Sequence, residues 1–190
     1  MKLNDIVEIC GGQAQFRITE TMDTNAPIYT FYSQAHLEQD LYLSNNPISP
    51  KEIRTFDRIT SLLSAGDVVF SLISGKTAQV REWHHQLLYT QNYLKLIPQS
   101  QIDQGYLVYL LNENQSIHKQ LSCGLQGSQV LKYTTKQLKS LKLPKLPALS
   151  KQRLIGNIYL KQQKLTYLKQ RVAHLERQLV LAQLQKASAK

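Results

Sequence analysis

The chain is poor in cysteine and has no long hydrophobic run. Its two cysteines, Cys10 and Cys123, lack the spacing of metal ligands. No apolar stretch approaches the roughly 20 residues needed to cross a bilayer, and the N-terminus turns polar at once, unlike a secretory signal. These absences exclude a disulfide framework and a membrane span. We therefore expect a cytoplasmic protein with reduced cysteines.

Acidic residues are scarce in the last third of the chain. Residues 132–190 contain 14 Lys or Arg against one acid, Glu176, whereas residues 1–131 contain 9 against 12. The net charge of +10 is thus −3 in the body and +13 in the C-terminal segment. A basic segment of this kind predicts a polyanionic partner, usually nucleic acid, although a merely solvated basic helix remains open.

The sequence also lacks a recognisable catalytic site. Ser74–Thr77 ends like a phosphate-binding loop, but Phe70 occupies the position of the motif's first glycine, so we expect a strand–turn–strand without nucleotide. His84 and His85 have no further ligand at a workable spacing and are read as a solvated or partner-facing loop. No carboxylate pair predicts metal-assisted cleavage. We expect no catalytic residue, no metal and no cofactor, and a nuclease with an unrecognised metal site is the weakest alternative.

Residues 1–143 have the mixed pattern of an α/β (α+β) globular domain. Asp103 is a suitable N-cap for a helix with apolar residues along one face, and Thr134 or Thr135 could cap a short helix ending near Leu138. Segments rich in β-branched and aromatic residues predict strands at 6–9, 28–32, 68–73, 77–81, 93–97 and 130–133.

The C-terminal segment predicts a long coiled-coil helix. Two prolines in 143–149 favour an extended connector, after which Ser150 is a plausible N-cap for a helix over about 151–186. This divides the chain into a recognition domain, 1–149, and an assembly helix, 150–190. Apolar residues recur at alternating spacings of four and three, interrupted by Lys161, as in the a/d seam of a coiled coil. The predicted dimerisation residues are Leu154, Ile158, Leu165, Leu168, Val172, Leu175 and Leu179.

One narrow apolar stripe on so long a helix needs another helix to cover it. The chain offers no second helix of comparable length, so a second copy is the natural partner. A helix that folds back on its own domain is the alternative.

Polar and basic residues in glycine-containing loops indicate binding rather than catalysis. Amides and hydroxyls read base edges, while Lys and Arg hold phosphates. The predicted residues at the interface with double-stranded DNA are Arg17, Lys76, Thr77, Gln126, Ser128, Gln129, Lys132 and Tyr133.

Several segments together resemble the specificity subunit of type I restriction–modification systems. The similar segments are the opening 2–9, the strand–turn 66–78, the helix 106–112 and the junction from 127–128 through 138–144 to 152–156. The resemblance covers nearly the whole chain, and its strength lies in the order and spacing of the segments.

The resemblance implies a non-catalytic subunit that gives DNA sequence specificity to a methyltransferase subunit and often, through it, to a restriction subunit. A full-length member has two recognition domains and two long helices, whereas this chain has one of each. We therefore expect a half-length subunit that dimerises through its helix and directs its partners to a bipartite site. The alternative from another class is a basic coiled-coil adaptor whose globular domain binds protein.

Overall fold

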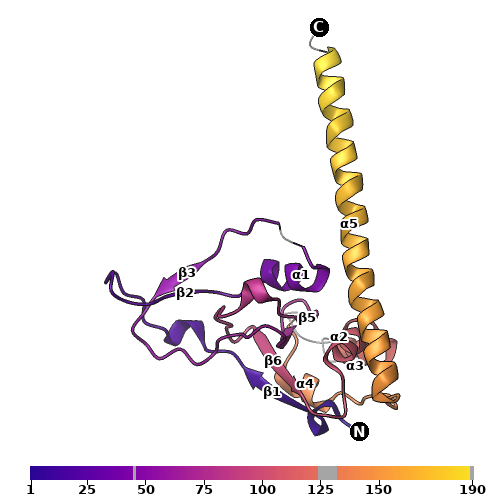
Figure 1. Ribbon diagram of the computed structural model, residues 1–190. Coiled ribbons are helices and arrows are strands. Elements are labelled where there is room, and N and C mark those ends of the chain that lie inside the picture. Colours follow the sequence, from indigo (N-terminus) through magenta and orange to yellow (C-terminus); the bar gives the residue numbers. More distant parts are fainter. Residues whose placement is uncertain (45, 124–131, 189–190) are drawn as a thin grey trace.

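A four-stranded antiparallel sheet forms the centre of the recognition domain in the computed structural model, which describes residues 1–44, 46–123 and 132–188 (Figure 1). The strands lie in the order β1 (Val7–Gly11), β6 (Tyr93–Pro98), β4 (Val68–Ser71) and β5 (Thr77–Gln79). All four residues of β4 are buried, because this strand has neighbours on both edges and helices nearby. The strand–turn–strand expected around Gly75 is confirmed.

Helices α1 (Gln34–Tyr42), α2 (Gln104–Glu113) and α3 (Gln115–Cys123) pack around this sheet. Asp103 caps α2, because its carboxylate accepts a hydrogen bond from Tyr106 N at 3.0 Å. One continuous helix was expected here. The helix instead breaks at Asn114, whose backbone is extended and whose Oδ1 accepts hydrogen bonds from Ser116 N and Ile117 N in the first turn of α3. The expected apolar face is buried across both helices, at Leu107, Leu110, Leu111, Ile117 and Leu121.

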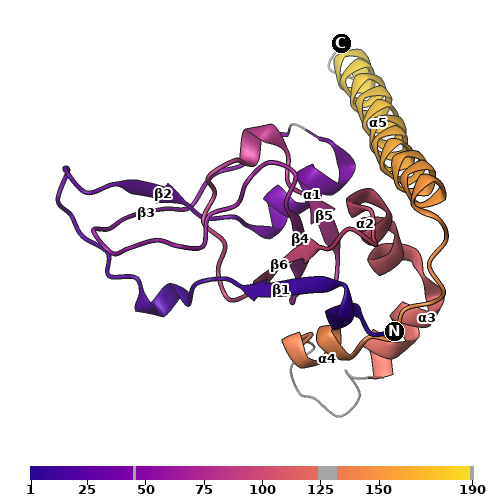
Figure 2. The ribbon, with the colours of Figure 1, turned by 60° about the horizontal axis from the view of Figure 1, so that its bottom comes forward.

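A two-stranded ribbon projects from the domain on the side away from the long helix (Figures 1 and 2). It consists of β2 (Ile28–Thr30) and β3 (Glu52–Arg54), paired antiparallel. A second small core underlies it, formed by Ile18, Phe31, Ile53 and Leu88. We call this ribbon and the flanking residues 15–27 and 55–58 the arm.

The short helix α4 (Thr135–Ser140) is capped by Thr134, whose hydroxyl accepts from Gln137 N at 3.2 Å, as one of the two candidate caps predicted. Residues 143–148 are not helical, as the two prolines indicated. Helix α5 (Leu149–Ser188) then runs for 40 residues. It begins one residue before the predicted cap Ser150, so Ser150 lies within the first turn.

The first turns of α5 pack closely against α2. Gly156 contacts the backbone of Gly105 so closely that a Cβ at Gly156 would lie 2.6 Å from Gly105 C. Gln152 is buried beside this crossing, donates to Pro147 O and Gln101 O, and accepts from Asp103 N. These contacts fix α5 to the recognition domain. The expected class, a mixed α/β domain followed by a long helix, is confirmed.

No helix in the described ranges is both long enough and apolar enough to cross a membrane.

Candidate functional site

The apolar stripe of α5 is exposed along its whole length. The seven predicted dimerisation residues are between 44% and 60% exposed, from Leu168 at the low end to Leu154, Ile158 and Leu179 at the high end. The recognition domain does not cover them. Folding of this stripe onto the chain's own domain, the alternative considered above, is therefore not what the structure shows.

A different face of α5 packs on the domain. Gln152, Gly156 and Tyr159 are buried, and Tyr159 Oη donates to Glu113 Oε1 at 2.9 Å. In the heptad that places Leu154 and Ile158 at d and a, Gly156 occupies f and Tyr159 occupies b, away from the seam. The helix thus uses one side to hold its own domain and leaves the seam side free of it.

Arg17 lies in the short turn η2 (Gln15–Arg17) on the arm, where it is exposed. Its guanidinium lies 5.7 Å from the centre of the Phe16 ring. Gln15 is held by a hydrogen bond from its backbone N–H to Gln91 Oε1 at 2.8 Å. The predicted loop is therefore anchored, with Arg17 at its surface.

Lys76 and Thr77 lie at the turn between β4 and β5 and differ in exposure. Thr77 is fully buried, and its backbone is paired to the Asn112 side chain through two hydrogen bonds of 2.8 Å. Its hydroxyl has no partner among the described residues. Lys76 is half-buried, with Nζ 5.7 Å from the centre of the Tyr42 ring. Only Lys76 of this pair presents side-chain atoms to solvent.

Lys132 and Tyr133 border a segment that lies outside the described residues, together with the predicted contacts Gln126, Ser128 and Gln129. Lys132 is exposed and donates to Asn92 Oδ1 at 2.7 Å. Tyr133 N donates to Leu72 O, and the Tyr133 ring covers Gly75, where a Cβ would lie 2.5 Å from it. Gly75 has φ +69°, so the turn requires glycine for both reasons.

Lys76 and Tyr133 line one cavity of about 260 Å³. Tyr159 of α5 and Glu113 of α2 also line it, so it lies at the junction of the domain and the long helix. Arg17 is on the arm instead. Among the predicted DNA contacts that the structure describes, Arg17 is therefore separated from Lys76 and Tyr133.

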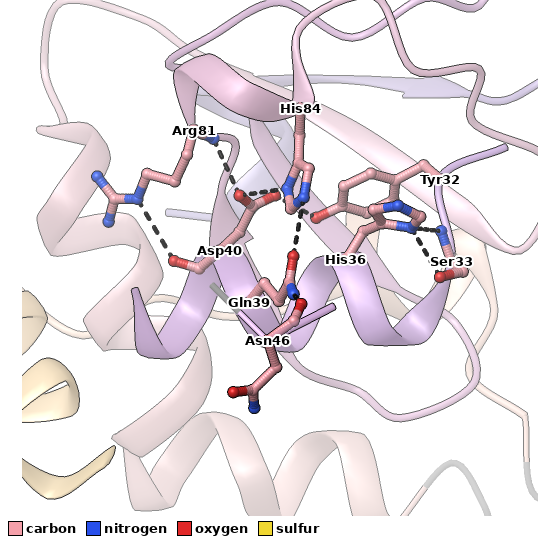
Figure 3. Close-up of polar contacts among 8 residues, drawn as sticks. All are labelled: Tyr32, Ser33, His36, Gln39, Asp40, Asn46, Arg81 and His84. Carbon is pink, nitrogen blue, oxygen red and sulfur yellow. Dashed lines mark hydrogen bonds and ion pairs between the residues drawn. The ribbon is translucent and has the colours of Figure 1, made fainter. Parts of the chain in front are cut away.

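A buried polar network, which the sequence did not reveal, is centred on Asp40 of α1 (Figure 3). Asp40 is fully buried. Its carboxylate accepts hydrogen bonds from Tyr32 Oη at 2.8 Å and Arg81 N at 3.0 Å, and it pairs with His84 Nδ1 at 2.8 Å. His84 is thus buried rather than solvated as expected, whereas the neighbouring His85 is exposed. The burial of Asp40 requires these partners, since an unpaired buried carboxylate is costly.

The network reaches α5 through a chain of side chains. His84 Nε2 lies 3.1 Å from Gln39 Oε1, so each ring nitrogen of His84 faces an oxygen atom. Gln39 Nε2 donates to Asn46 O, and Tyr167 Oη of α5 donates to Asn46 Oδ1 at 2.7 Å. This chain ties α5 to the interior of the recognition domain.

Burial perturbs two titratable groups of the network. Burial, with a smaller contribution from the neighbouring His84, lowers the pKa of His36 to about 4. It raises the pKa of Tyr32, with Asp40 adding to the shift. His36 Nδ1 accepts from Ser33 N at 3.1 Å, which closes the capping box of α1. These groups stabilise α1 and its connections, and no group of three or more His, Cys, Asp or Glu in the described ranges is placed to hold a metal.

Comparison with solved structures gives related folds. The chain is similar to an HsdS subunit from Thermoanaerobacter tengcongensis, with 22% identity, a TM-score of 0.55, and coverage of 93% of this chain and 38% of that one. A chain from a structure of a type I R-M system, described for its complex assembly and conformational transition, gives 22% identity, a TM-score of 0.65, and coverage of 98% and 43%. A type I restriction-modification S subunit from M. genitalium gives 13% identity, a TM-score of 0.50, and coverage of 93% of this chain and 40% of that one. The chain thus spans about two fifths of the length of the chains it matches.

No curated protein matches the chain. The family model described as the type I restriction modification DNA specificity domain matches residues 1–177, which include the recognition domain and most of α5. The order of segments, the mixed α/β domain and the long helix agree with that match, and the chain belongs to the family of type I restriction modification DNA specificity domains.

Proposed function

We propose that the chain is a DNA-recognition subunit that directs a partner methyltransferase subunit, and a restriction subunit where one is present, to a specific double-stranded DNA site in the cytoplasm. Membership of the specificity-domain family supports DNA recognition. The catalytic chemistry belongs to the partners, and the chain needs no cofactor of its own.

The exposed seam of α5 carries the second part of the proposal, a homodimer. Burial of a leucine side chain contributes roughly 1.5–3 kcal/mol to stability. The seven half-exposed apolar residues of the seam would therefore contribute a large free energy if a partner helix buried them. A second α5 supplies a seam of the same chemistry and length. A closed two-fold dimer then forms without any change in the contacts between α5 and its own domain.

A two-fold dimer presents the same reading surface twice, so the target is a split, palindromic site. The two helices separate the reading surfaces, and the non-specific gap between half-sites is set by helix length. An antiparallel pairing of the helices would place one recognition domain near each end.

The residues proposed to meet DNA are Arg17, Lys76 and Lys132, with Tyr133 beside Lys76 and with Gln126, Ser128 and Gln129 close to the reading surface. Arg17 and Lys132 are supported by exposure and charge. Thr77 was predicted with them, but its burial gives that prediction no support.

Methylation mapping with the matched methyltransferase subunit tests the proposal. Cells that contain both proteins should carry methylated inverted repeats with a fixed spacer, and neither protein alone should methylate these sites. Methyl transfer by this chain alone would contradict the non-catalytic role. An asymmetric or contiguous site would contradict the symmetric dimer.

A further inference from the structure

Arginine is concentrated on the arm. Residues 1–131 contain Arg17, Arg54, Arg58 and Arg81, and the first three belong to the arm. Arg81 is half-buried in the Asp40 network, and the Arg54 guanidinium donates to Thr24 O at 3.2 Å. Arg17 and Arg58 are exposed. The exposed guanidinium groups of the recognition domain are therefore both on the arm.

Large apolar side chains are also unusually exposed there. Met22 is 91% exposed, Phe16 79%, Phe56 64% and Ile28 48%. The exposure of these side chains does not arise from an unfolded segment, because the arm has its own small core and hydrogen bonds join its segments. Thr21 N donates to Arg54 O at 3.0 Å, and Thr19 N donates to Asp57 Oδ2 at 2.6 Å. An ordered ribbon that exposes both apolar and guanidinium side chains indicates a binding surface for a ligand that offers apolar contacts and hydrogen-bond acceptors.

We propose that the arm enters the major groove of the DNA, with Arg17 and Arg58 holding phosphates or guanine edges and Phe16 and Phe56 contacting bases. This inference rests on the proposed function and identifies the segment that would contact the bases. The arm, rather than the turn at Lys76, is then the main determinant of sequence.

The shape of the arm suits this role. The major groove, about 12 Å wide, admits a two-stranded β-ribbon. The arm projects from the domain in both views, away from α5, so DNA could approach it without displacing the helix (Figures 1 and 2).

The side chains along the arm also match base edges. Two open pockets lie on the arm and share Glu20: Met22, Ile28 and Arg54 line one, and Gln15 and Phe16 line the other. Amides recognise adenine, carboxylates accept from cytosine, arginine recognises guanine and apolar groups contact the thymine methyl. The arm contains four acids, Glu20, Asp23, Glu52 and Asp57, against its three arginines. This balance of charge favours contacts with base edges in a groove over general phosphate binding.

The test compares arm variants with matched variants elsewhere, in the complex with the methyltransferase subunit and on DNA that carries the mapped site. The double variant Arg17→Ala/Arg58→Ala is matched by Lys119→Ala, which removes an exposed cation of α3. Phe16→Ala is matched by Ile97→Ala, which truncates an apolar residue of β6 that is 40% exposed. Gel filtration and thermal unfolding verify assembly and folding.

We expect the double arginine variant to bind the site roughly ten- to a hundredfold more weakly, and each phosphate contact it removes to reduce the slope of log affinity against log salt by about one. Phe16→Ala should reduce the ratio of affinities for the cognate and a scrambled site by about tenfold. Both control variants should behave as the wild type.

Wild-type affinity and selectivity in both arm variants, in a complex that is itself selective, would overturn the inference and leave the proposed function intact. Loss of assembly with the methyltransferase subunit, with DNA selectivity retained, would overturn it in favour of a protein-docking arm. A wild-type complex with no site preference would overturn the proposed function and the inference together.

Discussion

The close crossing of α2 and α5 predicts a large effect of one methyl group at Gly156. A Cβ there would lie 2.5 Å from Tyr106 N, 2.6 Å from Gly105 C and 3.0 Å from Gly105 Cα. Favourable contacts between non-bonded heavy atoms lie near 3.5–4.0 Å, so the helices would have to separate by about 1 Å. All three atoms are backbone, and no side-chain rotation can relieve the overlap.

We expect Gly156→Ala to lower the free energy of unfolding by about 1–2 kcal/mol. Overpacking costs roughly 1–3 kcal/mol, and the better helix propensity of alanine recovers up to about 1 kcal/mol. Separation of the helices also strains the buried contacts of Gln152 and Tyr159. For a chain of this size, 1 kcal/mol corresponds to a fall in Tm of roughly 2–4 °C.

Urea unfolding of matched variants measures this effect. Asn157→Ala adds the helix propensity of alanine at an exposed position of the same turn, and Gly11→Ala adds a methyl group where nothing lies within 4 Å. Because the proposed dimerisation would add a concentration-dependent contribution to stability, all variants are compared at one protein concentration. If Gly156→Ala is as stable as Asn157→Ala, the backbones of α2 and α5 are not in contact and the reasoning fails.

Three further predictions concern the seam, the helix length and pH. Leu168→Lys with Leu175→Lys should give monomers by light scattering at tens of micromolar, because two charges in an apolar seam are not tolerated; a wild type that is itself monomeric would contradict the dimer. Deletion of residues 169–175 keeps the a/d register and shortens α5 by roughly 10 Å, so the spacer in the methylated site should shorten by about three base pairs; an unchanged spacer would mean that α5 does not set it. Because the pKa of His36 is lowered from 6.5 to about 4, the unfolded chain binds the proton more readily, and stability should fall as pH drops from about 6.5 to about 4. This loss should amount to at most about 2 kcal/mol after allowance for solvent screening, and His36→Asn should reduce it in urea titrations at several pH values.

Features set by local rules were predictable from the sequence. The seam of α5 follows from a repeat of seven residues, and the caps Asp103 and Thr134 follow from single side chains placed before apolar helices. The sequence could not show that a second face of α5, through Gly156 and Tyr159, packs on the domain. That face has no apolar repeat, because its closest contact is the backbone of Gly156 against Gly105, which is possible only since Gly156 has no side chain.

Features set by tertiary contacts were missed. Helix α1 places Leu37 and Leu41 in the core, but His36, Gln39 and Asp40 are buried beside them, and these polar residues disrupt the apolar period. Strand β3 was missed because Glu52–Arg54 contains a single buried residue. Both elements are stabilised by partners distant in sequence, which a local pattern does not reveal.

The two faces of α5 have different roles in the proposed symmetric dimer. In the proposed dimer, the seam side determines how two copies pair, whereas the side of Gly156 determines how each recognition domain is oriented on its helix. Tyr167 adds a second tie to the domain, about 16 Å further along the helix at 1.5 Å per residue. Two ties at different points of a rigid helix restrain rotation of the domain, so the arm is held at a fixed angle to the seam. Exchange of seam residues should therefore change which copies pair, while changes at Gly156 or Tyr167 should alter the spacing or orientation of half-sites without preventing dimerisation.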